Sequence, residues 1–183
     1  MAKTLIKTSG AISATTSEVT FVDGTSDVVL DGTYPVYEFH LYNIHPSDDA
    51  AKLMWRSRTG GAYGIATTST FIQTYHSEGG GSGNFSYNQD YDAAQGVGDL
   101  YLSDGVGYDI DQSASGYFRL YAPSNTDYIK HFQTEVQHVS AGDTCNISRT
   151  AGYINTESAV DGIKFFFSSN HIDAGEIKLF GVT

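Results

Sequence analysis

Hydrophobic and polar residues alternate with a period of two along several short segments of this chain, which is the pattern of half-buried β-strands. In the segment 36–44, Tyr37, Phe39 and Leu41 fall on one face, and the residues between them fall on the other. Further strands are predicted at 18–22, 27–30, 52–58, 70–76, 100–102, 116–121, 128–139, 145–154, 163–167 and 177–180. The one helical signal is a single turn at 47–52, which Ser47 would cap.

Turn-forming residues separate the predicted strands. Asp-Gly pairs at 23–24, 31–32 and 104–105 tolerate left-handed backbone, and residues 173–175 are expected to form a polar turn before the last strand. Residues 78–98, which begin with the run EGGGSG, are predicted to form a long surface loop. The whole chain of 183 residues therefore predicts a single all-β domain, a jelly-roll-like antiparallel β-sandwich with long Gly-rich loops. An irregular β-prism fits the same alternation.

Composition agrees with strands and excludes some partners. The chain holds 13 Tyr, 10 Phe and 20 Gly but 3 Pro, which suits pleated strands joined by turns. Its formal net charge of −11 would repel phosphate backbones and anionic lipid, so we predict neither a nucleic-acid nor a membrane partner. Cys145 is alone, which excludes an intrachain disulfide. Residues 1–9 lack the pattern of a signal peptide, so we expect synthesis in a cytoplasm without classical export.

Three acidic residues are a weak candidate for a calcium site. Asp104, Asp109 and Asp111 lie in a Gly-rich stretch, and calcium prefers several oxygen ligands from a loop that wraps around it. The EF-hand spacing is not met, and a solvated acidic turn explains the same residues more simply. The six histidines match no zinc motif, and no G-x-S-x-G element is present. We predict no cofactor and no catalytic residue.

Four residues are weak candidates for contact with a partner or a glycan. Tyr87 and Tyr91 lie in the predicted long loop, where a core does not explain them, and tyrosine combines an apolar ring with a polar hydroxyl. Lys3 and Lys7 are a small positive cluster within residues 1–17, which are either an arm that docks onto an acidic partner or an ordinary first strand.

Three segments carry a resemblance to a known class of protein. They are YEFHLYNIHPSDDA (37–50), STFIQTYHSE (69–78) and the C-terminal 151–183, which contains the ending I-D-A-G-x-I-K-L-x-G. The chain resembles small structural virion proteins of marine tailed bacteriophages, such as those infecting cyanobacteria, over most of its length. The resemblance implies a component of the virion that is present in many copies, and it implies no catalytic residue.

These observations lead to one preferred hypothesis and two others. The preferred one is a non-enzymatic virion surface protein, a decoration, cement or head-fibre subunit, which contacts other capsid or tail proteins and forms a homo-oligomer, with a trimer expected. The alternative is a tail or baseplate attachment protein that recognises a host surface glycan through tyrosine-bearing loops. The third is a glycan-cleaving enzyme, which would need two carboxylates facing across a groove.

Overall fold

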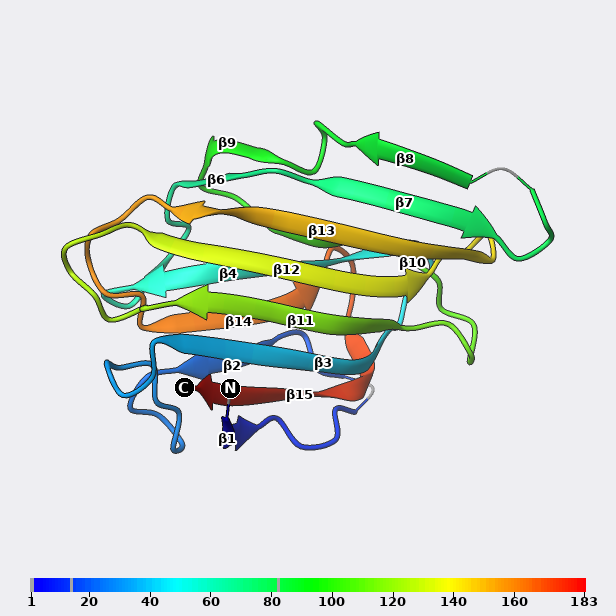
Figure 1. Cartoon of the computed structure of the whole chain (residues 1–183). Coiled ribbons are helices and arrows are strands. Elements are labelled where there is room, and N and C mark those ends of the chain that lie inside the picture. Colours follow the sequence, from blue (N-terminus) through cyan, green and yellow to red (C-terminus); the bar gives the residue numbers. More distant parts are fainter. Residues whose placement is uncertain (1, 14, 82) are drawn as a thin grey trace.

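The protein is described here by a computed structural model that covers residues 2–13, 15–81 and 83–183. Two antiparallel sheets pack face to face as a β-sandwich (Figure 1), which confirms the predicted fold class. The described residues contain no helix, and the turn predicted at 47–52 is instead a short reversal that leads straight into a strand at Ala51. No helix suited to crossing a lipid bilayer occurs in these residues.

The larger sheet has ten strands within the described residues, in the order β1-β15-β3-β11-β12-β13-β6-β9, and β7 pairs with β13 and with β8. Its strands are β1 (Lys3–Thr8), β3 (Val36–Pro46), β6 (Thr67–Ser69), β7 (Ile72–Ser77), β8 (Gly83–Tyr87), β9 (Ala93–Gly96), β11 (Ala114–Tyr121), β12 (Lys130–Val139), β13 (Thr144–Ile154) and β15 (Ile172–Val182). The smaller sheet has the order β10-β4-β14-β2, with β5 beside β4. Its strands are β2 (Val19–Val22), β4 (Ala51–Thr59), β5 (Ala62–Tyr63), β10 (Leu100–Val106) and β14 (Gly162–Phe167).

An aromatic core fills the space between the two sheets. Trp55 of β4 lies with its ring centroid 4.5 Å from that of Phe118 and 4.8 Å from that of Phe132, both on the larger sheet. Phe39 of β3 packs against Phe165 of β14 at 5.4 Å. All five side chains are buried. Each such ring contributes roughly 1.5–3 kcal/mol through burial, so this cluster holds the two sheets together.

A β-bulge interrupts the long strand β3. Up to Leu41 the odd-numbered residues point into the core, but Tyr42 and Asn43 are both exposed and Ile44 is buried, so the alternation inverts. Asn43 has a positive φ of 46°, which an extra bulged residue commonly requires. Both neighbouring strands shift register beside this point, β11 between Ala114 and Gly116, and β15 on either side of Ala174. The bulge therefore turns His45 outward at the end of the sheet.

The structure corrects the sequence predictions in three further places. Residues 27–30 are a loop, because Asp27 has a positive φ of 66°, although Val28 and Leu30 are buried and so mimic a strand pattern. The predicted loop 78–98 contains the edge strands β8 and β9. The expected polar turn at 173–175 lies inside β15, and the chain reverses before it.

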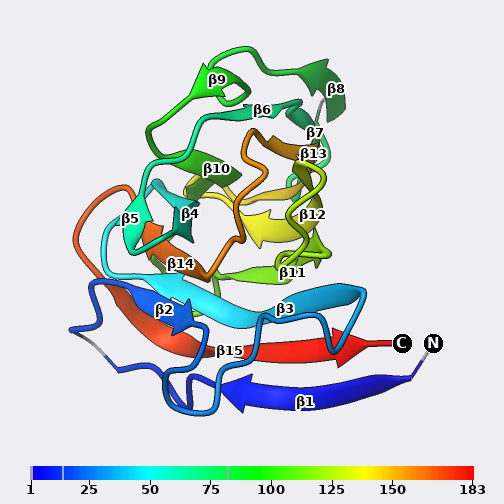
Figure 2. The same ribbon diagram turned by 90° about the vertical axis from the view of Figure 1, so that its left-hand side faces the viewer.

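The first stretch of the chain is a strand of the larger sheet. β1 pairs with β15 along its length (Figure 2), and the amide of Thr183 donates to the carbonyl of Ala2, so these two residues lie side by side. Met1 and Ala14, within the stretch considered as a docking arm, and Ser82, within the predicted loop, lie outside the described residues.

Candidate functional site

The broadest surface of the molecule is the outer face of the larger sheet, formed by side chains that point away from the smaller sheet. The strand register places four exposed hydrophobic residues on it: Leu5, Tyr42, Phe85 and Tyr87. They come from β1, β3 and β8, so they extend from one edge of the sheet to the other. Phe85 has 71% of its surface exposed. Large apolar side chains that are exposed to water are typical of a surface that contacts another protein.

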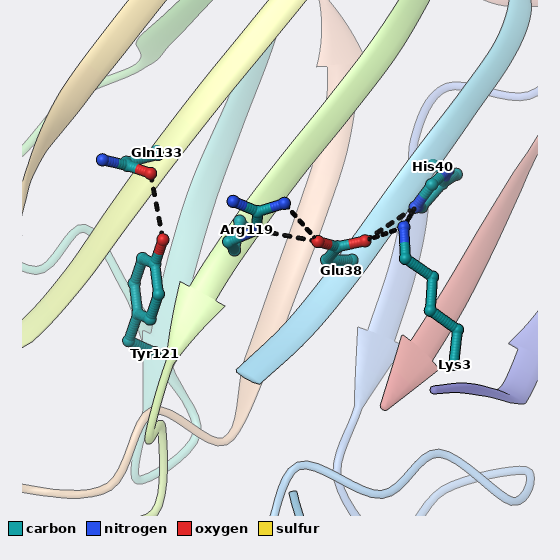
Figure 3. A network of polar contacts seen from close by, with 6 residues as sticks. All are labelled: Lys3, Glu38, His40, Arg119, Tyr121 and Gln133. Atoms are coloured by element: carbon teal, nitrogen blue, oxygen red, sulfur yellow. Dashed lines mark hydrogen bonds and ion pairs between the residues drawn. The ribbon is translucent and has the colours of Figure 1, made fainter. Parts of the chain in front are cut away.

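A charge network centred on Glu38 occupies the same face (Figure 3). Only 2% of the Glu38 side chain is exposed. Its carboxylate is held by three side chains that lie on the strands β1, β3 and β11. Arg119 of β11 donates through Nε at 2.7 Å, His40 lies with Nε2 at 3.0 Å, and Lys3 of β1 forms an ion pair. The network ties the edge strand β1 to the middle of the sheet. It keeps this part of the surface ordered.

These partners determine the ionisation of Glu38. Burial alone would raise its pKa, but the hydrogen bonds from Lys3, His40 and Arg119 outweigh burial and lower the pKa to about 2. Because the folded-state pKa lies below that of the unfolded chain, Glu38 stabilises the fold above about pH 4.5. Its contribution is lost as the pH falls toward about 2.

Replacing Glu38 by glutamine is expected to lower the free energy of unfolding by about 1–2 kcal/mol at pH 7. The amide keeps the shape of the side chain but removes the charge that holds Lys3 and Arg119. Because these two cations are partly exposed, they regain water, so the cost stays below that of breaking a fully buried ion pair. Urea unfolding measures the change. Glu135→Gln is the matched control, because Glu135 pairs with the largely exposed Arg149 on the same face, and its loss should cost less than about 0.5 kcal/mol. Equal costs for the two variants would contradict the role given to Glu38.

The two predicted contact lysines differ in their surroundings. Lys3 is committed to Glu38, and its Nζ also lies 3.2 Å from Nε2 of His40. Lys7 follows a register shift in β1 and lines a cleft between the N-terminal segment and β2, where no carboxylate comes within ion-pair distance among the described residues. The structure thus separates the roles of the two cations. Docking onto an acidic partner stays a prediction, with Lys7 as its more available member.

The two predicted contact tyrosines also differ. Tyr87 is exposed on β8, and its hydroxyl donates to Asp92 at 2.6 Å. Tyr91 is half-buried: its ring packs 5.2 Å from Phe71 and its hydroxyl donates to Asp104 at 2.8 Å. Burial is the main reason that the pKa of Tyr91 is raised, and Asp104 adds to the effect. Tyr91 therefore anchors the segment between β8 and β9 to the sandwich, which leaves Tyr87 as the accessible ring of the two.

The predicted calcium residues lie on different elements. Asp104 is in β10 and accepts hydrogen bonds from Tyr91 and from the amide of Gly105. Asp109 and Asp111 are exposed in the loop between β10 and β11. Within residues 2–13, 15–81 and 83–183, no three carboxylate, histidine or cysteine side chains come together as metal ligands.

A polar cavity that the sequence did not indicate lies beside this loop. Its volume is about 520 Å³, and we call it the end cavity because it lies at the end of β3 and β15 where the loop between β10 and β11 folds over them. Its main lining residues are Asn43, His45, Tyr108, Ile110, Asp111 and Asp173. Of these six residues, only Asp111 is a candidate site residue on sequence grounds. The bulge in β3, which brings Asn43 and His45 there, depends on pairing with strands far away in the chain.

Two histidines have structural settings of their own. The ring of His45 bridges two acceptors, with Nδ1 2.8 Å from Oδ1 of Asp173 and Nε2 3.1 Å from the carbonyl of Asp109. His138 of β12 is fully buried, and neither ring nitrogen has a hydrogen-bond partner among the described residues. Burial lowers the pKa of His138 to about 4, against a small opposing effect of Asp104.

Comparisons with known proteins give no family for this chain. No protein-family model matches it, and neither a curated protein nor a solved structure shows significant similarity. A functional conclusion therefore rests on the surfaces described above and on the resemblance noted from the sequence.

Proposed function

We propose that this chain is a non-enzymatic structural subunit of a phage particle, a decoration, cement or head-fibre protein that works by contact with neighbouring virion proteins. The observation that supports it most is the outer face of the larger sheet. That face is ordered by the Glu38 network, and it exposes hydrophobic side chains on strands from β1 to β8. Exposed hydrophobic side chains on an ordered sheet face suit a protein partner.

The composition of this face fits an interface better than a solvated surface. Arg119 lies over the ring of Tyr117 at 5.2 Å, and His40 stacks near Tyr42. Tyrosine, phenylalanine and arginine are the residues enriched where proteins meet. Homo-oligomerisation through closed symmetry would let one small subunit use this face repeatedly on a particle. The resemblance to virion proteins of marine tailed phages makes the virion the assembly to test.

Quantitative mass spectrometry of gradient-purified particles tests the proposal. We expect the chain to copurify with the particles in a fixed ratio to the major capsid protein. Its presence in the lysate but not in the particles would overturn the virion assignment. The ratio also distinguishes a head-surface protein, present in many copies, from a tail component present in few.

Phe85→Asp is expected to reduce incorporation into particles at least roughly tenfold, because it places a charge in the apolar part of the contact face. Phe85 is exposed on an edge strand, so folding should be preserved, and circular dichroism checks this. Tyr128→Asp is the matched control, since Tyr128 is equally exposed but lies in the loop between β11 and β12. If both variants incorporate like the natural chain, the outer face is not the contact surface.

A further inference from the structure

We propose that the end cavity binds a neutral, hexose-sized sugar unit of a glycan. The cavity uses none of the four exposed hydrophobic residues assigned to the outer face, so it is a separate part of the surface from the proposed contact face. Its volume of about 520 Å³ lies within the range of small-molecule sites. One wall is the loop 107–113, and the other is formed by the ends of β3 and β15.

The loop wall is held in place from behind. Gln112 is 4% exposed; its Oε1 accepts a hydrogen bond from the amide of Asp109 at 3.2 Å, and its Nε2 donates to Asp143 at 2.9 Å. Position 107 must be glycine for this arrangement, because a Cβ there would overlap the Gln112 side-chain amide. A loop that is already ordered loses little conformational entropy when a ligand binds. The outward side chains of the loop are thus presented in fixed positions.

The strand wall is equally fixed. His45 joins the two walls, because its ring contacts the Asp173 carboxylate on β15 and the Asp109 carbonyl on the loop. Asn43, the bulged residue of β3, has its amide N–H bonded to Oγ of Ser115 at 2.9 Å, and its Oδ1 lies 3.3 Å from the same hydroxyl. The side-chain NH₂ of Asn43 has no partner among the described residues, so it is available as a donor.

The groups that face the cavity match the chemistry of a sugar. Tyr108 is 53% exposed and offers a flat apolar ring for the C–H face of a pyranose. The carboxylates of Asp111 and Asp173 accept hydrogen bonds from hydroxyl groups, and Asn43 can donate one. Two carboxylates in the site, and a net charge of −11 on the chain, disfavour phosphate or uronate ligands. A neutral polyhydroxylated ligand satisfies all of these groups.

Backbone amide NMR titration with methyl glycosides of glucose, galactose and mannose tests the site, with methyl glucuronide as the anionic comparison and a glycan array to extend the panel. We expect a neutral glycoside to shift the resonances of 43–45, 107–113 and 172–174. Tyr108→Ala should weaken the Kd roughly tenfold through loss of the stacking ring. Asp111→Asn, which keeps the side-chain shape, should weaken it roughly fivefold.

Tyr128→Ala is the matched control, because Tyr128 is 71% exposed and lies at the opposite end of β11. Its Kd should equal that of the natural chain. The proposal is overturned if no neutral sugar on the panel shifts the cavity resonances, or if Tyr108→Ala binds as well as Tyr128→Ala. It is also overturned if calcium alone produces those shifts, reversibly with EDTA, while the sugars do not, since the carboxylates would then serve a cation.

Discussion

Replacing Trp55 by alanine is expected to lower the free energy of unfolding by about 3–5 kcal/mol. Trp55 is fully buried and lies between the two sheets, where its ring contacts Phe118 and Phe132. Removing it leaves a cavity that rigid, hydrogen-bonded sheets cannot close. The destabilisation therefore includes both the lost transfer free energy of the indole ring and the free energy of the cavity. Urea unfolding followed by circular dichroism measures the change, because Trp55 is the single tryptophan and its fluorescence is lost with it.

Trp55→Phe is the control for the alanine variant. Phenylalanine retains most of the aromatic contact, and it removes an indole N–H that has no hydrogen-bond partner among the described residues. The expected cost is therefore less than about 2 kcal/mol. A cost below about 1 kcal/mol for Trp55→Ala would show that the sheets do not depend on this cluster for their packing.

Acid is expected to destabilise the fold by roughly 3 kcal/mol between about pH 6.5 and pH 4 through His138 alone. The unfolded chain protonates this ring near pH 6.5, whereas burial lowers its pKa to about 4 in the folded protein. Between about pH 6.5 and pH 4 the His138 ring is therefore protonated in the unfolded state but not in the folded state. The stabilising contribution of the neutral ring is fully present above about pH 6.5, and it decreases as the pH falls to the folded-state pKa of about 4. This window lies mostly above the one in which Glu38 titrates.

His138→Leu is expected to remove most of this acid sensitivity without a loss of stability at pH 7, because the buried ring nitrogens have no partners to lose among the described residues. Free energies of unfolding at pH 7 and at about pH 4 provide the measurement. His131→Leu is the matched control, since His131 lies on the same strand but is exposed on the outer face. If the two leucine variants retain the same pH dependence, His138 is not the residue responsible.

The interior of the sandwich follows largely from local pattern. Tyr37, Phe39 and Leu41 were placed together on one face of a strand by alternation, and all three are buried between the sheets. The fold class followed in the same way, because a period of two in short segments separated by turn residues leaves few alternatives to packed antiparallel sheets. Where apolar residues are buried in a loop, as at Val28 and Leu30, the same local rule gave a strand that does not exist.

Edge strands are the elements that local pattern missed. β8 and β9 are short and lie in a polar, Gly-rich stretch, so the sequence indicated a loop, yet β8 pairs with β7 and β9 with β6. Hydrogen bonding to a neighbouring strand, rather than burial of a face, defines such elements. The side chains of residues 83–96 do not indicate which strands pair with β8 and β9.

The amino-acid sequence by itself determined that this protein is an all-β sandwich and which side chains enter its core, because alternation is a property of consecutive residues. Tertiary structure alone decided where its functional groups gather. The Glu38 network joins residues 3, 38, 40 and 119, and the end cavity joins 43, 108, 111 and 173. Both depend on register between strands that are distant in the chain, and register is fixed by the packing of the whole sheet.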